Sequence, residues 1–258
     1  ACVLTSADVP RLPFTRAGQG HPEPSPHDKF ILDTYVRYVG DEVAVVAAVD
    51  EATARKAMAL VKVEYEVLEA VLDFERALDN KTVIHPEPEI HDMFPIGFEP
   101  KRNVAAAYRM EIGHVEKVLA DCEVRVESTY YTQAQAHVAL EPHTAYTYLD
   151  LHGRLNVVTS TQNPYHTRRL MGQALDIPLR NIRVYKPRIG GGFGGKQHVH
   201  VEPYAALVTL RTGKPAKVVM SRKEVFESSF ARHQMRLTVR IGARKDGRNR
   251  AIEMQGLS

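Results

Sequence analysis

Hydrophobic positions near the start of the chain follow first a strand-like and then a helix-like period. The valine-rich run 43–49 is short and apolar, as is typical of a buried strand. Asp50 follows as a helix N-cap, and apolar residues then recur at helical spacing. Residues 61–67 (VKVEYEV) alternate strictly, which predicts a half-buried strand, and 74–78 predicts a short helix. Together with a strand at 2–5, these elements predict a compact α+β unit.

Two proline-rich stretches separate the regular segments. Residues 10–29 contain five prolines, which predicts a surface loop. Residues 80–103 contain four prolines and little apolar periodicity, which predicts a linker. The expected organisation is therefore a first domain at 1–79, a linker at 80–103 and a second domain at 104–258.

The second domain shows a mixture of strand and helix patterns. A tight turn at Asp150-Leu151-His152-Gly153 predicts a hairpin, and a second turn at Lys245-Asp246-Gly247 predicts another. Pro164 falls in the first turn of a helix beginning near Thr161 or Asn163. The predicted strands are 122–132, 144–149, 155–160, 182–185, 216–220, 236–241 and 251–254, and the predicted helices are 114–120, the one containing Pro164, and 201–210.

Composition narrows the class of protein. With 44% hydrophobic and 25% charged residues over 258 positions, the chain is globular. A net charge of +3 gives no argument for binding nucleic acid. No stretch approaches the roughly 20 apolar residues of a membrane span. Cys2 and Cys122 are too few for a disulfide framework, which favours a reducing, cytoplasmic location. Neither cysteine has an iron–sulfur spacing.

A glycine-rich segment, Gly190-Gly191-Gly192-Phe193-Gly194-Gly195-Lys196-Gln197, is the most informative stretch. A purely structural turn is one interpretation. A phosphate loop is another, but Gln197 stands where Ser or Thr would hold Mg²⁺. A dinucleotide fingerprint is a third, with Glu224 beyond the next strand, but the following helix begins several residues too late for the glycines to open it.

The same segment, preceded by Ser160-Thr161-Gln162-Asn163-Pro164, resembles the molybdenum hydroxylases, the xanthine dehydrogenase and aldehyde oxidase family. The resemblance is to their large molybdopterin-binding subunit and covers essentially the whole chain. Residues 1–79 resemble most of the a/b hammerhead domain, without its start. Ala139-Leu140-Glu141-Pro142-His143 resembles the family's E-P-H or E-P-R segment, and Arg222-Lys223-Glu224 with Arg232-His233 resembles the stretch after the glycine loop.

The resemblance implies an α+β fold: an a/b hammerhead domain followed by the first part of a mixed α/β molybdopterin-binding domain. It implies that Gln162 donates to an oxo ligand of molybdenum, although a helix-capping role is the plainer alternative. It places the backbone of Gly191, Gly192, Phe193 and Gly194 against the metal and pterin; Gln162 and Phe193 would surround molybdenum without ligating it. Phe193 could equally be a core aromatic. Gln197 replaces a Glu that contacts purine in xanthine-oxidising members, which puts a purine substrate in question.

Other polar clusters allow plainer interpretations. His198, His200 and Glu202 alternate, which could suggest zinc, but the family binds its metal through pterin sulfurs. His137 and His143 flank Glu141 as expected of a satisfied polar cluster. Lys196 is expected to be structural or to face the cofactor, and Cys122 to be a small buried hydrophobe.

No segment matches the family's G-x-G-x-P cofactor run or its general-base Glu, both expected beyond Ser258. The chain thus resembles roughly the first third of a large subunit, a fragment or one chain of a split subunit, with no catalytic residue of its own and no activity alone. The expected complex oxidises an N-heteroaromatic, purine-like compound or an aldehyde, with water as oxygen source. It would carry molybdenum-molybdopterin, in the cytosine dinucleotide form, with the remaining molybdopterin-binding polypeptide, an iron–sulfur ([2Fe–2S]) subunit and an FAD subunit as partners. The alternatives are a non-catalytic cofactor scaffold or assembly chain and, more distantly, a nucleotide-binding dehydrogenase.

Overall fold

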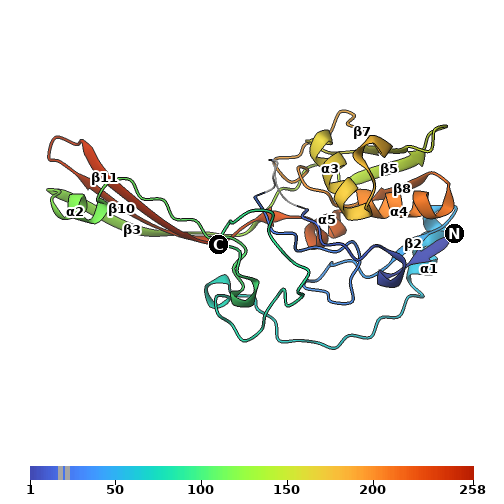
Figure 1. Ribbon diagram of the computed structural model, residues 1–258, viewed down its shortest axis with the longest axis horizontal. Coiled ribbons are helices and arrows are strands. Elements are labelled where there is room, and N and C mark those ends of the chain that lie inside the picture. Colours follow the sequence, from blue (N-terminus) through green and yellow to red (C-terminus); the bar gives the residue numbers. More distant parts are fainter. Residues whose placement is uncertain (17–19, 21–23) are drawn as a thin grey trace.

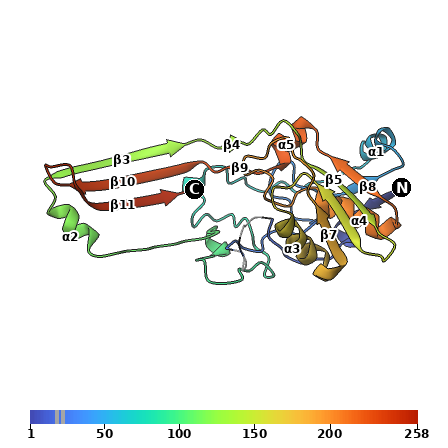
Figure 2. The ribbon, with the colours of Figure 1, turned by 90° about the horizontal axis from the view of Figure 1, so that it is seen from above.

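The computed structural model describes residues 1–16, 20 and 24–258. It shows a rounded body from which a narrow arm extends (Figures 1 and 2). The body holds most of the helices and a four-stranded sheet, and the arm is a three-stranded sheet with one short helix. Strands and helices from both halves of the chain build the body, so the α+β prediction is confirmed.

The sheet of the body has the strand order β7-β6-β5-β8. Strands β5 and β6 form the predicted hairpin, β8 pairs antiparallel with β5, and β7 pairs parallel with β6. Helix α3 connects the parallel pair, and α4 packs on the same sheet and contacts α3. The bounds are β5 Thr144–Leu149, β6 Leu155–Thr159, α3 Pro164–Leu175, β7 Ile182–Tyr185, α4 Glu202–Thr212 and β8 Ala216–Val219.

This topology gathers three loops at one edge of the sheet. Because β6 and β7 are parallel, the segments that follow them, 160–163 and 186–201, leave from the same edge. Thr144 at the start of the antiparallel β5 lies opposite the end of β6, so the segment before it, 137–143, arrives there too. Carboxyl ends of neighbouring parallel strands are a common place for ligand sites.

The first strands of the chain attach to this sheet by apolar side chains. Strand β1 (Cys2–Leu4) pairs with β2 (Val45–Ala47), and α1 (Glu51–Met58) follows with Asp50 accepting from the Thr53 N–H, as predicted. Strand β2 is shorter than the predicted run and only half-buried. Leu4 joins the core formed by Leu155, Leu170 and Met171.

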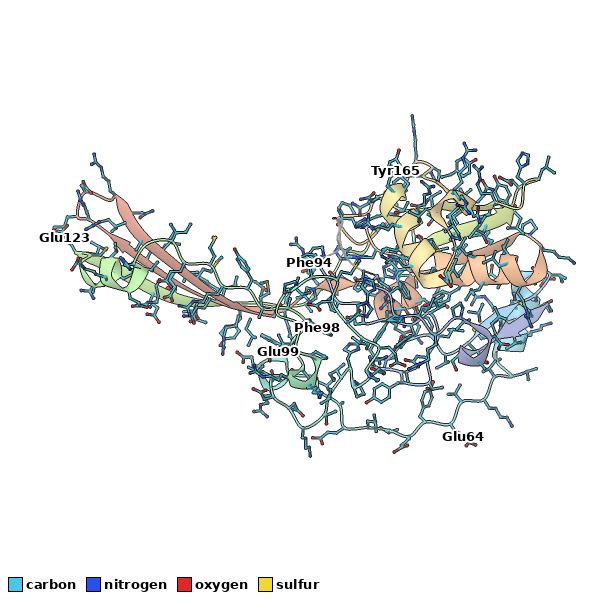
Figure 3. All side chains as sticks on the ribbon, in the orientation of Figure 1. Glu64, Phe94, Phe98, Glu99, Glu123 and Tyr165 are labelled. Atoms are coloured by element: carbon cyan, nitrogen blue, oxygen red, sulfur yellow. The ribbon has the colours of Figure 1, made fainter. Side chains whose placement is uncertain are left out.

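Two predictions for this first part are wrong. The stretch 10–29 is irregular but not superficial, because Phe14 is buried in the core next to the irregular residues Ile31 and Leu32; residues 17–19 and 21–23 of that prediction lie outside the described residues. Residues 61–67 form no strand, since a strand requires a neighbour for its N–H and C=O groups and none of the described residues pairs with them. Figure 3 shows Glu64 on this outlying segment.

The arm is an antiparallel sheet in the order β11-β10-β3, with α2 against it. Gly242 allows α2 to approach: a Cβ there would lie 2.5 Å from the Cys122 sulfur, and Cys122 is buried as predicted. The bounds are α2 Val115–Ala120, β3 Val124–Thr132, β10 Met235–Ala243 and β11 Asn249–Leu257.

The two faces of the arm differ in character. The face that α2 contacts carries a charged network in which Arg240 bonds Glu116 and Glu253. The opposite face is apolar, and Val126, Tyr130 and Met254 on it are each more than half exposed. By the strand register the large apolar side chains of this face, among which Ser128 also lies, are Val124, Val126, Tyr130, Leu237, Val239, Ile241, Ile252 and Met254.

Smaller elements complete the chain. Strands β4 (Gln135–Ala136) and β9 (Ala231–Arg232) pair where the arm joins the body, and α5 (Arg222–Ser228) precedes β9. The 3-10 helices of the described residues are η1 Ser6–Asp8, η2 Phe74–Arg76, η3 Pro100–Arg102 and η4 Leu179–Asn181. The predicted helix at 74–78 is thus a single 3-10 turn. Among the described residues, no helix has the length and apolar character that crossing a membrane requires.

Candidate functional site

The glycine-rich loop folds back on itself at the sheet edge described above. Gly191, Phe193 and Gly194 all have left-handed backbone, with φ of 94°, 53° and 94°. The N–H of Gly195 donates to the Gly192 carbonyl at 2.8 Å, which closes a tight turn around Phe193. Left-handed backbone in a phenylalanine is strained, and such strain concentrates at functional sites.

Gln162 lies against this loop and is fixed by it. Its side-chain Oε1 accepts the N–H groups of Gly194 at 3.0 Å and Lys196 at 3.1 Å. Its backbone N–H donates to the Lys196 carbonyl at 2.8 Å. The helix-capping alternative is wrong, because Asn163 is the N-cap of α3 and accepts from the His166 N–H. With Oε1 satisfied by two donors, the side-chain NH₂ of Gln162 has a defined direction in which to donate.

The glycines are required by close approach. A Cβ at Gly192 would lie 2.5 Å from Gln162 Oε1, and one at Gly195 would lie 2.8 Å from the His137 ring. Gly192 and Gly195 therefore allow the loop to pack directly on these two side chains, and neither has left-handed backbone.

The outer side of the loop is open. The Phe193 side chain is 73% exposed, so the core-aromatic alternative is wrong. Within the described part of the chain, the backbone N–H groups of Gly191, Gly192 and Phe193 donate to no protein acceptor. An exposed aromatic ring beside consecutive unused N–H groups suits an anionic or oxygen-bearing ligand.

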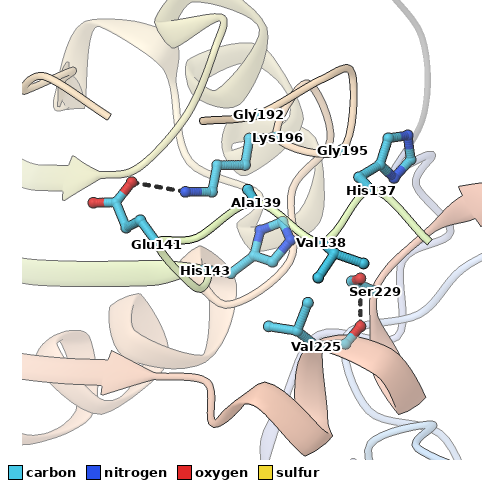
Figure 4. A pocket seen from close by; sticks show the side chains of 10 residues that line it. All are labelled: His137, Val138, Ala139, Glu141, His143, Gly192, Gly195, Lys196, Val225 and Ser229. Carbon is cyan, nitrogen blue, oxygen red and sulfur yellow. Dashed lines mark hydrogen bonds and ion pairs between the residues drawn. The ribbon is translucent and has the colours of Figure 1, made fainter. Parts of the chain in front are cut away.

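The inner side of the loop is held by an ion pair (Figure 4). Lys196, buried by the loop, donates from Nζ to Glu141 Oε2 at 2.7 Å, and the Gly190 N–H donates to the same oxygen at 2.8 Å. Burial by itself raises the pKa of the Glu141 carboxyl, but the hydrogen bonds from Lys196 and Gly190 outweigh it, and the pKa lies below its usual value. The space between Glu141, His137 and α5 measures only ≈ 10 Å³, room for about one water.

Histidines surround this inner side, and burial keeps two of them, His143 and His200, neutral. Burial, with the nearby Lys196 charge, lowers the pKa of His143 to about 4. Burial also lowers the pKa of His200 well below its usual value, and the rings of His143 and His200 contact each other at 4.3 Å between centroids. His137 Nδ1 lies 3.1 Å from the Phe230 carbonyl oxygen. His143 and His200 therefore pack around the loop without adding charge to it.

The other sequence candidates also lie near the loop. Glu202 is buried and accepts from the Thr159 hydroxyl at 2.7 Å and from the His200 N–H at 2.8 Å. The described residues contain no group of three or more His, Cys, Asp or Glu side chains able to hold a metal. Helix α4 begins at Glu202, so the glycines do not open it, and the dinucleotide interpretation loses its structural basis. Gln197 is half-buried in the last turn of the loop.

The Glu141–Lys196 pair was not predicted from the sequence. The sequence pattern places Glu141 in a short motif and in a polar cluster with His137 and His143, and it indicates for Lys196 only a structural or cofactor-facing charge. Their separation by 55 positions hides the contact, which arises because the loops before β5 and after β7 share one edge of the sheet.

Fold and loop together define a cofactor-binding domain: a mixed sheet presents an open, donor-rich glycine loop at the carboxyl ends of two parallel strands. Residues 98–258 match the family model of the molybdopterin cofactor-binding domain, and residues 1–69 match that of the aldehyde oxidase and xanthine dehydrogenase a/b hammerhead domain. The chain belongs to the aldehyde oxidase and xanthine dehydrogenase family of molybdenum hydroxylases. The resemblance to this family seen in the sequence is confirmed, and so is the order of the two domains, the hammerhead domain first and the molybdopterin-binding domain second.

Three known proteins illustrate the relationship. The chain is 36% identical to a probable hypoxanthine oxidase of Escherichia coli O157:H7, over 98% of this chain and 29% of that protein. It is 36% identical to the nicotinate dehydrogenase large molybdopterin subunit of Eubacterium barkeri, over 87% of this chain and 50% of the subunit. The aldehyde oxidoreductase of Desulfovibrio gigas shares the fold, with a TM-score of 0.83 and 24% identity over 99% of this chain and 27% of that one. The chain spans less than a third of the first of these relatives.

Proposed function

We propose that this chain forms part of the molybdopterin site of a molybdenum-dependent hydroxylase or dehydrogenase that oxidises an N-heteroaromatic, purine-like compound or an aldehyde, with water as oxygen source. The observation that carries the proposal is the fixed carboxamide of Gln162 beside the open loop. Relatives described as a probable hypoxanthine oxidase and as a nicotinate dehydrogenase large molybdopterin subunit support the substrate class.

The residues present fit such a group. The loop offers the unused N–H groups of Gly191, Gly192 and Phe193, and a side chain at Gly192 would fill the space that Gln162 occupies. These donors, with the backbone of Gly194, suit the oxygen atoms of a molybdenum–molybdopterin group. When bound, that group supplies the two-electron redox centre.

Each of the site residues in this chain positions the bound group or the substrate. Gln162 donates from its NH₂ to the bound group, and this direction is fixed before binding, so no reorganisation is needed. The loop backbone holds the group against the sheet edge, and the Phe193 ring shields one side of it from water. Gln197 contacts the substrate as a neutral donor and acceptor. No side chain of the chain ligates the metal.

The rest of the enzyme lies outside residues 1–258. The general-base Glu, the cytosine dinucleotide pocket, the [2Fe–2S] clusters and FAD belong to the remaining molybdopterin-binding polypeptide and to iron–sulfur and FAD subunits, in a cytoplasmic complex. The exposed apolar face of the arm supports the presence of a partner polypeptide, because contiguous exposed apolar surface marks an interaction site. Within this chain, the first domain comprises residues 1–79, the linker residues 80–103 and the second domain residues 104–258.

Replacement of Gln162 by Ala in the complete enzyme tests the proposal. We expect kcat to fall by about 10²-fold or more, the usual effect of removing a preorganised donor, with molybdenum content unchanged. Gln135→Ala, at an exposed position of β4, is the matched control and should keep the wild-type rate.

Three outcomes would contradict the proposal. Wild-type turnover of the Gln162→Ala enzyme at full molybdenum loading would exclude the assigned role. Absence of molybdenum and pterin from the folded, complete wild-type complex would exclude the enzyme class. Cofactor bound without turnover of any heteroaromatic or aldehyde substrate would favour the scaffold alternative.

A further inference from the structure

One carboxylate closes the base of the glycine loop. Glu141 Oε2 accepts from the Gly190 N–H, where the loop begins, and from Lys196 Nζ, where it ends. The backbone N–H of Glu141 also donates to the Gly190 carbonyl at 3.2 Å. A Cβ at Gly190 would lie 2.7 Å from the Glu141 Cβ, so the backbone segments that carry these two residues are in direct contact. Glu141 thus holds both ends of the segment that carries Phe193.

The backbone of Lys196 connects the Glu141 ion pair to Gln162. The Lys196 N–H donates to Gln162 Oε1, and the Lys196 carbonyl accepts from the Gln162 N–H and from the Thr161 hydroxyl. The Lys196 side chain is only 1% exposed, whereas that of Glu141 is 35% exposed. A buried ammonium needs an anionic partner, so the position of Lys196 depends on Glu141.

The neighbourhood offers Lys196 no other anion at hydrogen-bond distance among the described residues. His137 and His143 also line the space beneath the loop (Figure 4), and the pKa of His143 is lowered, so that ring is neutral. Loss of the Glu141 charge would therefore leave a buried, unpaired cation directly beneath the loop, and the loop would have to move to solvate it.

We propose that Glu141 and Lys196 are a pair of positioning residues that fixes the glycine loop, and through it the carboxamide of Gln162 and the backbone at Phe193. Neither side chain contacts the reacting atoms. The inference rests on the proposed function for its effect on catalysis, but the effect on the loop itself does not require a cofactor.

The test uses the complete enzyme with Glu141→Gln, which keeps the size of the side chain, and Lys196→Met, which keeps its length. Glu227→Gln is the matched control, since Glu227 pairs with Lys223 on the surface of α5. Hydrogen exchange is measured for the peptide spanning 188–197, and kcat, KM and molybdenum content are measured on the same samples. Glu141→Asp, which keeps the charge on a shorter side chain, is the second variant.

We expect amide exchange in 188–197 to rise by about 10- to 100-fold in Glu141→Gln and Lys196→Met, as for a lost charged hydrogen bond. We expect kcat to fall at least about 10-fold, with KM changed less than about 3-fold and molybdenum retained. Glu141→Asp should lie between these variants and wild type. The double variant should be no worse than either single one, because the two residues act as a unit.

Wild-type exchange in both single variants would overturn the proposal, and so would additive losses in the double variant. If Glu141→Gln fails to fold, the exchange of Glu141→Asp and Lys196→Met decides the question in the same way. Absence of molybdenum from the wild-type enzyme would refute the proposed function alone, because the exchange measurement still reports whether the pair holds the loop.

Discussion

Gly192→Ala tests the geometry of the site most directly. The new Cβ would lie 2.5 Å from Gln162 Oε1 and 2.7 Å from its Cδ, whereas ordinary contacts begin at 3.4 Å. The carboxamide must therefore move by roughly 1 Å, a displacement that can cost about 10²-fold in rate. Gly192 does not have left-handed backbone, so the loop itself can accept Ala and the effect comes from the clash.

The displaced Oε1 would lose its two bonds from Gly194 and Lys196. At about 0.5–1.5 kcal/mol for each bond, the loop loses about 1–3 kcal/mol of local stability. We expect kcat of the complete enzyme to fall about 10²-fold, and exchange of these amides to rise by up to about 10²-fold.

The control for this experiment is Gly256→Ala in β11. Its new Cβ would lie 3.2 Å from one flexible atom, Leu237 Cδ2, and its backbone is not left-handed. We expect wild-type rate and wild-type loop exchange. If Gly192→Ala also keeps the wild-type rate and exchange, then the contact between Gly192 and Gln162 does not position the carboxamide, and the reasoning is refuted.

Two further predictions concern stability and assembly. Burial lowers the pKa of His143 from 6.5 to about 4, so between these pH values the unfolded chain binds a proton that the folded chain does not. The free energy of unfolding therefore falls as the pH drops from 6.5 towards 4, by about 2 kcal/mol at pH 5. Urea unfolding at pH 7 and pH 5 measures this fall, which should be smaller in the His143→Gln variant than in the wild type. In the complete enzyme we expect a partner to cover the apolar face of the arm. A thiol-reactive probe should then label Val126→Cys on that face at least about 10-fold more slowly than Thr129→Cys on the opposite face. Equal labelling rates would show that the apolar face is uncovered.

The sequence determined the elements whose signals are local. Strands β5 and β7 begin and end where the pattern predicts, because a turn or a proline bounds them. The Asp50 cap of α1 and the start of α3 at Pro164 follow from side-chain chemistry within one helical turn. The glycine loop was evident because consecutive glycines have a conformational cost that a chain rarely carries without a reason.

Tertiary structure decided what depends on distant partners. Residues 61–67 have a strand pattern but find no strand neighbour in the described part of the chain, whereas Phe14 is buried although it lies in a proline-rich stretch. The exposure of Phe193 follows from the left-handed turn of the loop and not from its hydrophobicity. Periodicity reports which face of a segment is apolar, but not whether anything covers that face.

The site combines both kinds of information. Motif order alone indicated Gln162 and the glycines. Only the parallel pairing of β6 with β7, and the antiparallel return of β5, bring Glu141 to Lys196. The physical reason is that an ion pair depends on distance in space, and the sheet topology that sets this distance is fixed by burial of the whole core rather than by the residues near either partner.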